Sequence, residues 1–343
     1  MVRMPSGVRI QIHTDSPKLG LHFHATNMVT PPAERRPIVF NLEIPQASGN
    51  PIAETSSTQG NTIQLDRSRP GEFELLRGEP DTIWFENLPT DFKTCELWLP
   101  HNALIELRTL HIEDGSKIKP LPRDSRPHWI HYGSSISHCM EASAPAYTWP
   151  AVAARQAGFT LQSLGVGGQC HLDQFVARTI RDADADLISI KTGINVINMD
   201  SMRERVYEPA LHGFLDTIRE GQPDTLITLI SPIYCPSAER HPGPTIPNAD
   251  GKFVTIPGHE DIRAGCMTLT RVREIITNVV SRRREAGDPN LFYVDGLSLF
   301  GESDAHDLPD DLHPNPAGYV RMGERFGEVL ADLVDALDLT EAM

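Results

Sequence analysis

The sequence predicts an α/β protein with two domains of different class. An all-β sandwich of jelly-roll type is expected over residues 1–117, and a three-layer α/β/α domain with a five-stranded parallel sheet over residues 128–343. Apolar residues alternate with polar ones in the first third of the chain, as in half-buried antiparallel strands. Short apolar runs then alternate with longer helical stretches, as in βαβ units. Three prolines within residues 118–127 disfavour helix and central strand and indicate a linker there.

The first domain is predicted from apolar residues at every second position, with turn-forming clusters at residues 45–52 and 67–71. Trp84 lies in an apolar Ile-Trp-Phe run and is expected in the core, whereas Trp98 and His101 are candidates for a binding face. The domain either binds carbohydrate or an acceptor molecule or walls off one side of the active site, and we favour the structural role. The alternating positions are Val8, Ile10, Ile12, Leu21, Phe23, Phe40, Leu42, Ile44, Phe73, Leu75, Cys95, Leu97, Leu99, Ile105 and Leu107.

The second domain contains five apolar runs that predict parallel strands, with helices between them. Thr148 is the expected N-cap of the first helix, with Pro150 in its first turn. Residues 233–261 hold five prolines and show no regular pattern, and a loop of this length indicates a functional segment such as a lid. The expected strands are 129–132, 160–164, 187–190, 226–230 and 291–294, and the expected helices are 149–157, 172–182, 201–220, 263–285 and 316–337.

Composition limits the classes of partner. A formal net charge of −15 opposes binding to phosphate backbones and anionic lipid surfaces, so neither nucleic acid nor membrane is an expected partner. No apolar run reaches the roughly 18 residues of a membrane span, and the first residues hold no signal-peptide apolar region. Five cysteines without CxxC spacing fit reduced thiols. We expect a soluble cytoplasmic protein of unknown oligomeric state.

Four of the predicted strands are followed by residues suited to acyl transfer. Ligands bind at the carboxyl ends of the strands in an open parallel sheet, so these segments are expected to meet. Acyl transfer needs a nucleophile, a base, an orienting carboxylate and oxyanion donors, and the four segments contain all of them. They are residues 133–137 (Gly-Ser-Ser-Ile-Ser), 165–169 (Gly-Val-Gly-Gly-Gln), 193–195 (Gly-Ile-Asn) and 310–314 (Asp-Asp-Leu-His-Pro).

Each segment alone has an ordinary structural interpretation. Glycine and serine dominate turns, an asparagine after a strand forms Asx turns, and an aspartate before a helix is a common N-cap. The first segment also lacks the second glycine of the G-x-S-x-G nucleophile elbow, because Ser137 occupies that position. From the residues alone, Ser134 and Ser137 remain rival nucleophiles beside Ser135, and Asp311 remains a rival to Asp310.

Taken together, the four segments resemble the blocks of the SGNH (GDSL-type) hydrolase family, in the family's order and over about residues 128–337. The aspartate of the family's first block is Ser134 here, and the one that often follows the third block's asparagine is Val196. Neither change removes a group that performs chemistry. The resemblance implies Ser135 as the nucleophile, His313 as the base, Asp310 as its orienting carboxylate, and the Ser135 and Gly168 N–H groups with the Asn195 amide as oxyanion donors.

Within this family the chain is most similar to members with an N-terminal β-sandwich. That resemblance implies either ester hydrolysis or acyl transfer in natural-product tailoring. The implied function is a serine esterase that cleaves an ester of a small or medium acyl group through an acyl-serine intermediate and needs no cofactor or metal. The partner is then a small-molecule ester or acyl donor. The alternatives are an acyltransferase with an alcohol or sugar acceptor, and an inactive binding protein.

A zinc site is the competing hypothesis for the same sheet edge, since three loops there carry cysteine and histidine. The pairs are adjacent in sequence, which disfavours a shared ion, and Cys139 and Cys170 are expected to line the acyl pocket instead. His131 is expected to pack inside a strand, whereas Asp304, His306 and Asp307 are expected on the loop surface. The zinc candidates are His138, Cys139, Cys170, His171 and Cys235.

Overall fold

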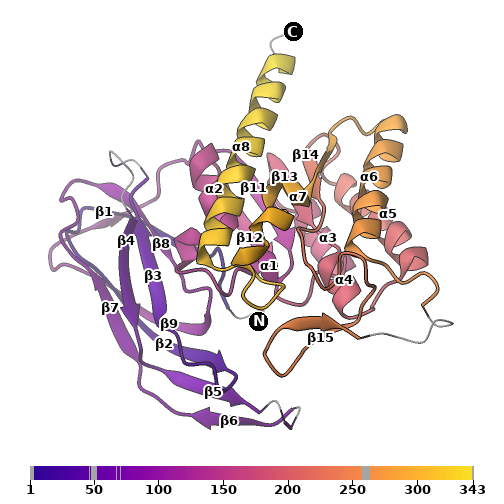
Figure 1. Cartoon of the computed structure of the whole chain (residues 1–343). Coiled ribbons are helices and arrows are strands. Elements are labelled where there is room, and N and C mark those ends of the chain that lie inside the picture. Colours follow the sequence, from indigo (N-terminus) through magenta and orange to yellow (C-terminus); the bar gives the residue numbers. More distant parts are fainter. Residues whose placement is uncertain are drawn as a thin grey trace. The chain divides into compact units, whose positions relative to one another are not determined.

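Figure 1 shows the computed structural model, which describes residues 4–45, 47, 52–66, 68–69, 71–256 and 263–341. The chain divides into two compact units, one of residues 1–125 with 143–146 and the other of residues 126–142 with 147–343. The first is built from β-strands and the second from alternating strands and helices, so the predicted fold class is confirmed.

The first unit consists of two sheets that enclose one apolar core. The strand pairs are antiparallel except β2 with β5. The inward side chains come from both sheets, and the rings of Phe23 and Phe40 lie 4.8 Å apart between them. One sheet has the order β10 (Ile118–Lys119), β1 (Arg9–Thr14), β8 (Lys93–Trp98), β3 (Ile38–Glu43), β4 (Ile52–Ser57); the other has β6 (Phe73–Leu76), β5 (Asn61–Leu65), β2 (Leu19–Val29), β7 (Asp81–Phe85), with β9 (Ala103–Ile112) also on β2.

The structure corrects the expected position of Trp84. Its side chain is 38% exposed, because Ile83 and Phe85 occupy the inward positions of β7 and alternation turns the residue between them outward. The outward indole covers Gly20 of β2, where a Cβ atom would lie 2.5 Å from the ring. Trp98, in contrast, is buried and donates its indole N–H to Glu43 at 3.1 Å.

Two further expectations for the first unit are corrected by the structure. His101 is 1% exposed, so like Trp98 it belongs to the interior rather than to a binding face. Ile118 and Lys119, expected in the linker, pair with β1 as β10. Residues 143–146 join this unit from a loop of the second one, and the Ala146 N–H donates to Asn41 Oδ1.

The second unit is built on a sheet with the order β12-β11-β13-β14-β17, in which all pairs are parallel. Its helices form two groups, α2 with α8, and α3 and α6 with α5, as in a doubly wound fold (Figure 1). The five predicted strands are all present, each within one residue of its expected ends. They are β11 (His128–Gly133), β12 (Thr160–Gly165), β13 (Leu187–Lys191), β14 (Leu226–Ile230) and β17 (Leu291–Val294).

The predicted helices are also present, with later starts for three of them. The first begins after Thr148 and has Pro150 in its first turn, as expected. Another begins only at Leu269, because the Thr268 hydroxyl accepts the Arg271 N–H and caps it there. No helix in the described part of the chain is long and apolar enough to cross a membrane. The helices are α1 (Ser135–His138), α2 (Trp149–Ala157), α3 (Gln174–Arg181), α4 (Ile194–Asn198), α5 (Glu204–Arg219), α6 (Leu269–Glu285), α7 (Gly296–Leu299) and α8 (Pro316–Glu341).

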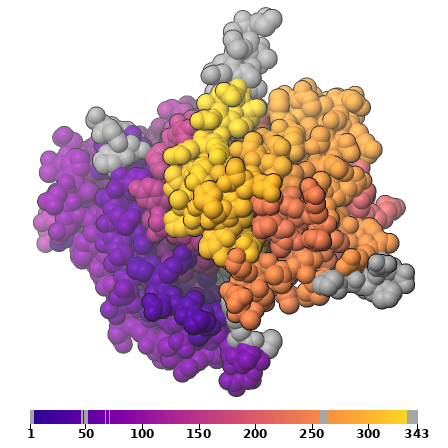
Figure 2. Space-filling model, viewed as in Figure 1, coloured from indigo at the N-terminus to yellow at the C-terminus, as the bar shows by residue number. Residues whose placement is uncertain are grey.

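The described part of residues 233–261 contains a hairpin of β15 (Thr245–Pro247) and β16 (Phe253–Thr255). Its tip lies beside the segment before α8, and the Phe253 N–H donates to the Asp310 carbonyl at 2.9 Å (Figures 1 and 2). The lid hypothesis also covers residues 257–261, which lie outside the described residues.

Candidate active site

Ser135 is the first residue of α1, directly after β11. The turn is short because the Ser134 hydroxyl accepts the Ile136 N–H at 3.3 Å and caps the helix. The helix can approach β12 closely only because residue 165 is glycine, since a Cβ atom there would lie 2.6 Å from the Ser137 carbonyl carbon. The local sequence thus presents the Ser135 hydroxyl at the strand end.

His313 connects Ser135 to Asp310. Its Nδ1 lies 2.7 Å from Asp310 Oδ2 and its Nε2 lies 2.9 Å from Ser135 Oγ. An ionised carboxylate only accepts hydrogen bonds, so Nδ1–H donates to Asp310 and Nε2 accepts the Ser135 hydroxyl hydrogen. The Asp310 Oδ1 atom accepts the backbone N–H groups of Leu312 and His313, which fixes the carboxylate against the ring. A nucleophile, base and orienting acid can act in this order.

Two opposing effects set the pKa of His313. Burial, the largest of them, lowers it, but the hydrogen bond to Asp310 and the charges of Glu141 and Asp310 outweigh burial and raise the pKa above its usual value. For Asp310, burial raises the pKa, and the bonds from His313 and from the backbone reverse this, so the pKa is lowered. The pair therefore favours an ionised carboxylate beside an imidazole that readily accepts a proton.

The rival residues have other partners. Ser137 is buried and its hydroxyl lies 2.7 Å from Nε2 of His131, a buried ring whose pKa falls to about 3, chiefly because of burial. Ser134 is also buried, as the cap of α1. Asp311 has a left-handed φ of 63° and its carboxylate pairs with Lys252 at 3.1 Å. Within the described residues, no hydrogen bond or ion pair joins any of these side chains to the Ser135 hydroxyl.

The expected oxyanion residues lie at the ends of the two strands that flank β11. Gly133 pairs with Gly165 of β12 and with Lys191 of β13, so the segments that follow start at one level. Gly168 has a φ of 71°, which glycine adopts without strain. Among the described residues, no hydrogen bond occupies the backbone N–H of Gly168 or of Ser135.

Asn195 is oriented by a contact that the sequence did not reveal. Its Oδ1 accepts the backbone N–H of Cys170 at 3.0 Å, so the amide nitrogen faces away and has no partner among the described residues. The only signal in the sequence was the position of Cys170, two residues after Gly168. The side chain of Asn195 is 4% exposed, and such a buried, oriented donor suits a developing oxyanion.

We expect Asn195→Ala to lower kcat by about 10²- to 10³-fold with little change in KM, the usual cost of losing one oxyanion donor. Steady-state kinetics on an activated ester would measure it. Asn198→Ala, three residues later on α4, is the matched control and should keep the wild-type rate. Equal rates for Asn195→Ala and the control would remove Asn195 from the oxyanion site.

The described residues do not support the zinc hypothesis. No group of three or more His, Cys, Asp or Glu side chains among them is placed to hold a metal ion. The thiols bond to carbonyl oxygens instead: Cys139 to Ile136, Cys170 to Lys191, and Cys235 to Asp311. Burial raises the pKa of Cys170 to about 11. Cys139 and Cys170 are both 0% exposed and are interior residues.

Asp304 and Asp307 are not surface decoration, which corrects the expectation for them. Both are buried, and their carboxylates accept from Arg321 and Arg325 of α8 at 2.6–3.2 Å. Only His306 of this group is exposed. The ion pairs fix the residues before the Asp310 segment to the helix that follows it.

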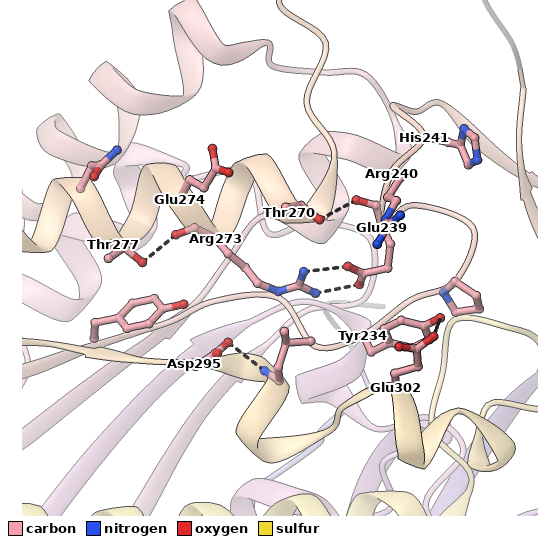
Figure 3. Close-up of a pocket in the computed structure, with 14 residues that line it drawn as sticks. Tyr234, Glu239, Arg240, His241, Thr270, Arg273, Glu274, Thr277, Asp295 and Glu302 are labelled. Carbon is pink, nitrogen blue, oxygen red and sulfur yellow. Dashed lines mark hydrogen bonds and ion pairs between the residues drawn. The ribbon is translucent and has the colours of Figure 1, made fainter.

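Figure 3 shows a cavity of about 910 Å³ that lies between the loop after β14, helix α6 and the end of β17. Arg273, on its wall, is buried and forms a bidentate ion pair with Glu239, and Tyr234 donates to Glu302 at 3.3 Å. None of the five expected site residues lines it. The Arg273 guanidinium also donates to the carbonyls of Pro232 and Ile233, so these bonds hold the loop after β14 against α6.

Residues 131–321 match the model of the GDSL-like lipase/acylhydrolase family. No curated protein sequence matches the chain. Among solved structures, the salicylyl-acyltransferase SsfX3 from a tetracycline biosynthetic pathway is 30% identical, with 96% of this chain and 83% of that chain covered and a TM-score of 0.75.

Two further structures are similar in fold. A protein from Bacteroides ovatus described as a GDSL-like lipase is 19% identical, with coverages of 97% and 86% and a TM-score of 0.66. A family two carbohydrate esterase from Clostridium thermocellum, in complex with cellohexaose, is 12% identical, with coverages of 96% and 93% and a TM-score of 0.61. Each likeness extends over nearly all of this chain.

Proposed function

The chain belongs to the GDSL-like lipase/acylhydrolase family, an esterase and acyltransferase class, and on this premise we propose that it transfers an acyl group through an acyl-serine intermediate on Ser135. The observation that carries the proposal is the chain of two short hydrogen bonds, from Ser135 to His313 and from His313 to Asp310. A serine hydroxyl is a weak nucleophile at neutral pH, and this arrangement supplies the base that it needs.

In the first half-reaction the Ser135 oxygen attacks the acyl carbonyl while His313 Nε2 takes its proton. The carbonyl oxygen becomes an oxyanion, for which the Ser135 and Gly168 N–H groups and the Asn195 amide are the donors at hand. The imidazolium, held by Asp310, then gives the proton to the departing group as the acyl–oxygen bond of the ester breaks. The acyl-serine remains.

In the second half-reaction His313 Nε2 takes the proton of the incoming hydroxyl, whose oxygen attacks the acyl carbonyl. The bond between the acyl group and Ser135 Oγ then breaks as His313 returns the proton to that oxygen. If the hydroxyl belongs to water, the protein is an esterase for small or medium acyl groups. If it belongs to an alcohol or a sugar, the protein is an acyltransferase. The second candidate is favoured by the 30% identity to a salicylyl-acyltransferase over 96% of the chain, which includes the β-sandwich unit.

A panel of p-nitrophenyl esters, assayed with and without an added alcohol, separates the two. An esterase releases p-nitrophenol and free acid in equal amounts, and the alcohol leaves that ratio unchanged. An acyltransferase converts most of the released acyl group into a new ester, detected by mass spectrometry, and turns over faster as the alcohol concentration rises. Release of p-nitrophenol that persists in the Ser135→Ala variant would contradict both.

A further inference from the structure

We propose that His171, together with Ser201, is a positioning residue for the oxyanion site, because its ring holds the backbone of Gly168. The N–H group of Gly168 is one of the proposed oxyanion donors, so the inference rests on the proposed acyl-serine function and adds to it two residues that act through Gly168. His171 lies in the loop between β12 and α3, and Ser201 lies in the turn between α4 and α5.

The His171 ring is bonded through both of its nitrogen atoms. Nε2 lies 3.1 Å from the Gly168 carbonyl oxygen, and Nδ1 lies 2.9 Å from the Ser201 hydroxyl oxygen. A carbonyl oxygen only accepts hydrogen bonds, so Nε2 carries the hydrogen and donates it to Gly168. The Nδ1 atom of the neutral ring then accepts, and the Ser201 hydroxyl donates to it. The two bonds form one chain from Ser201 through His171 to Gly168.

This chain fixes the peptide group that follows Gly168. The carbonyl of that group accepts from His171, and its N–H, which belongs to Gln169, donates to the Val166 carbonyl at 3.1 Å. The peptide is therefore held at both ends. Glycine adopts many backbone conformations, so the φ of 71° at Gly168 is not held by residue type alone. The two bonds restrict it, and with it the direction of the Gly168 N–H.

The same chain ties the Gly168 loop to the segment that carries Asn195. The Ser201 N–H donates at 3.1 Å to the carbonyl of Val196, the residue after Asn195 on α4. The Cys170 N–H donates to Asn195 Oδ1 at 3.0 Å, so two side-chain bonds cross between the loop and the α4 segment. An oxyanion site lowers the barrier through donors that are in place before the charge develops. A fixed relation between Gly168 and Asn195 serves this purpose.

Replacements of His171 separate the N–H donor from the bulk of the ring. His171→Ala removes both bonds, so we expect kcat to fall about tenfold with little change in KM, a smaller loss than the 10²- to 10³-fold cost of removing a donor outright. His171→Gln places an amide N–H close to the position of Nε2 and should keep kcat within about threefold of wild type. The shorter amide of His171→Asn reaches only the position of Nδ1, so this variant should behave like His171→Ala.

Ser201→Ala removes only the outer bond of the chain. The Nε2 bond to Gly168 stays, but the ring is less firmly oriented, so we expect kcat to fall about two- to threefold. In all four variants the decrease of kcat/KM at low pH should stay at the wild-type pH, because none of them changes His313 or Asp310.

A boronic acid inhibitor tests the oxyanion site without turnover. It adds to the serine hydroxyl and forms a tetrahedral adduct, one oxygen of which takes the oxyanion position. Interactions made only in the transition state also stabilise such an adduct, so its inhibition constant should rise about tenfold in His171→Ala and stay near the wild-type value in His171→Gln.

The first unit supplies a matched control in His24. Its Nε2 atom lies 3.1 Å from the carbonyl oxygen of Gly78, so the bond is of the same kind and length as the bond between His171 and Gly168. His24 belongs to the unit that lacks Ser135, Asp310 and His313. We expect His24→Ala to keep the wild-type kcat and the wild-type inhibition constant.

The experiment is steady-state kinetics on an activated ester, with inhibition by the boronic acid, for wild type and the five variants. Wild-type kcat and inhibition constant in His171→Ala would overturn the inference. Equal losses in His171→Gln and His171→Ala, or a lower kcat with an unchanged inhibition constant, would overturn it as well. If wild type forms a covalent adduct with a fluorophosphonate, these outcomes contradict this inference alone, whereas a wild type that forms no adduct would overturn the proposed function and this inference with it.

Discussion

Ser135→Ala is expected to abolish turnover, with kcat lower by on the order of 10⁶-fold, the loss found when a triad nucleophile is removed. Its hydroxyl is the one bonded to His313, and alanine leaves the ring without a nucleophile to activate. The measurement is intact-mass spectrometry after treatment with a fluorophosphonate, which adds one covalent mass to an active serine. We expect one adduct on wild type and none on Ser135→Ala.

Ser134→Ala is the control for this experiment, because it changes the neighbouring serine and leaves the candidate nucleophile in place. The Ser134 hydroxyl caps α1, so the variant should lose about 1 kcal/mol in the free energy of unfolding and keep its adduct. If the adduct forms on Ser135→Ala but not on Ser134→Ala, the nucleophile is Ser134 and not Ser135.

His313→Ala is expected to have the second large effect, with kcat lower by roughly 10⁴- to 10⁶-fold, since base and nucleophile act as a unit. Only the neutral ring accepts the serine proton, and the pKa of His313 is raised above its usual value. Activity of the wild type should therefore fall as the pH decreases through a value above about 6.5, the ordinary histidine pKa. A profile of kcat/KM against pH measures this decrease, which forms the acid limb of the profile.

His306→Ala is the matched control, since His306 is an exposed histidine close in sequence whose ring bonds to the Ser303 carbonyl. It should keep both the wild-type rate and the acid limb. A wild-type acid limb well below pH 6.5, or substantial turnover by His313→Ala, would assign the base to another residue.

Much of the fold was predictable because it depends on short-range patterns. Period-two alternation locates strands of a half-buried sheet, and short apolar runs locate strands covered on both faces, so all five parallel strands were found nearly to the residue. The contact between Asp310 and His313 is also local, because the two residues are three apart in sequence and one turn brings their side chains together. The strand-end rule then predicted which segments lie along one edge of the sheet.

The sequence alone could not choose among the serines 134, 135 and 137. Their partners differ, because the Ser135 hydroxyl lies 2.9 Å from His313, 178 residues away in sequence, whereas the Ser137 hydroxyl lies 2.7 Å from the ring of His131, six residues away. The orientation of Asn195 is of the same kind, because it depends on the backbone of Cys170 in another loop. No local pattern encodes these contacts.

What the sequence by itself determined was the order of elements, the class of each unit and the set of chemical groups at the sheet edge, since all three depend on residue type and spacing. Only the tertiary structure decided which members of each set contact one another. It turned Trp84 outward, buried Asp304 and Asp307 against arginines of α8, and brought Ser201 to His171. The physical reason is that hydrogen bonding and desolvation depend on what surrounds a group in space, and those neighbours come from segments that the fold brings together.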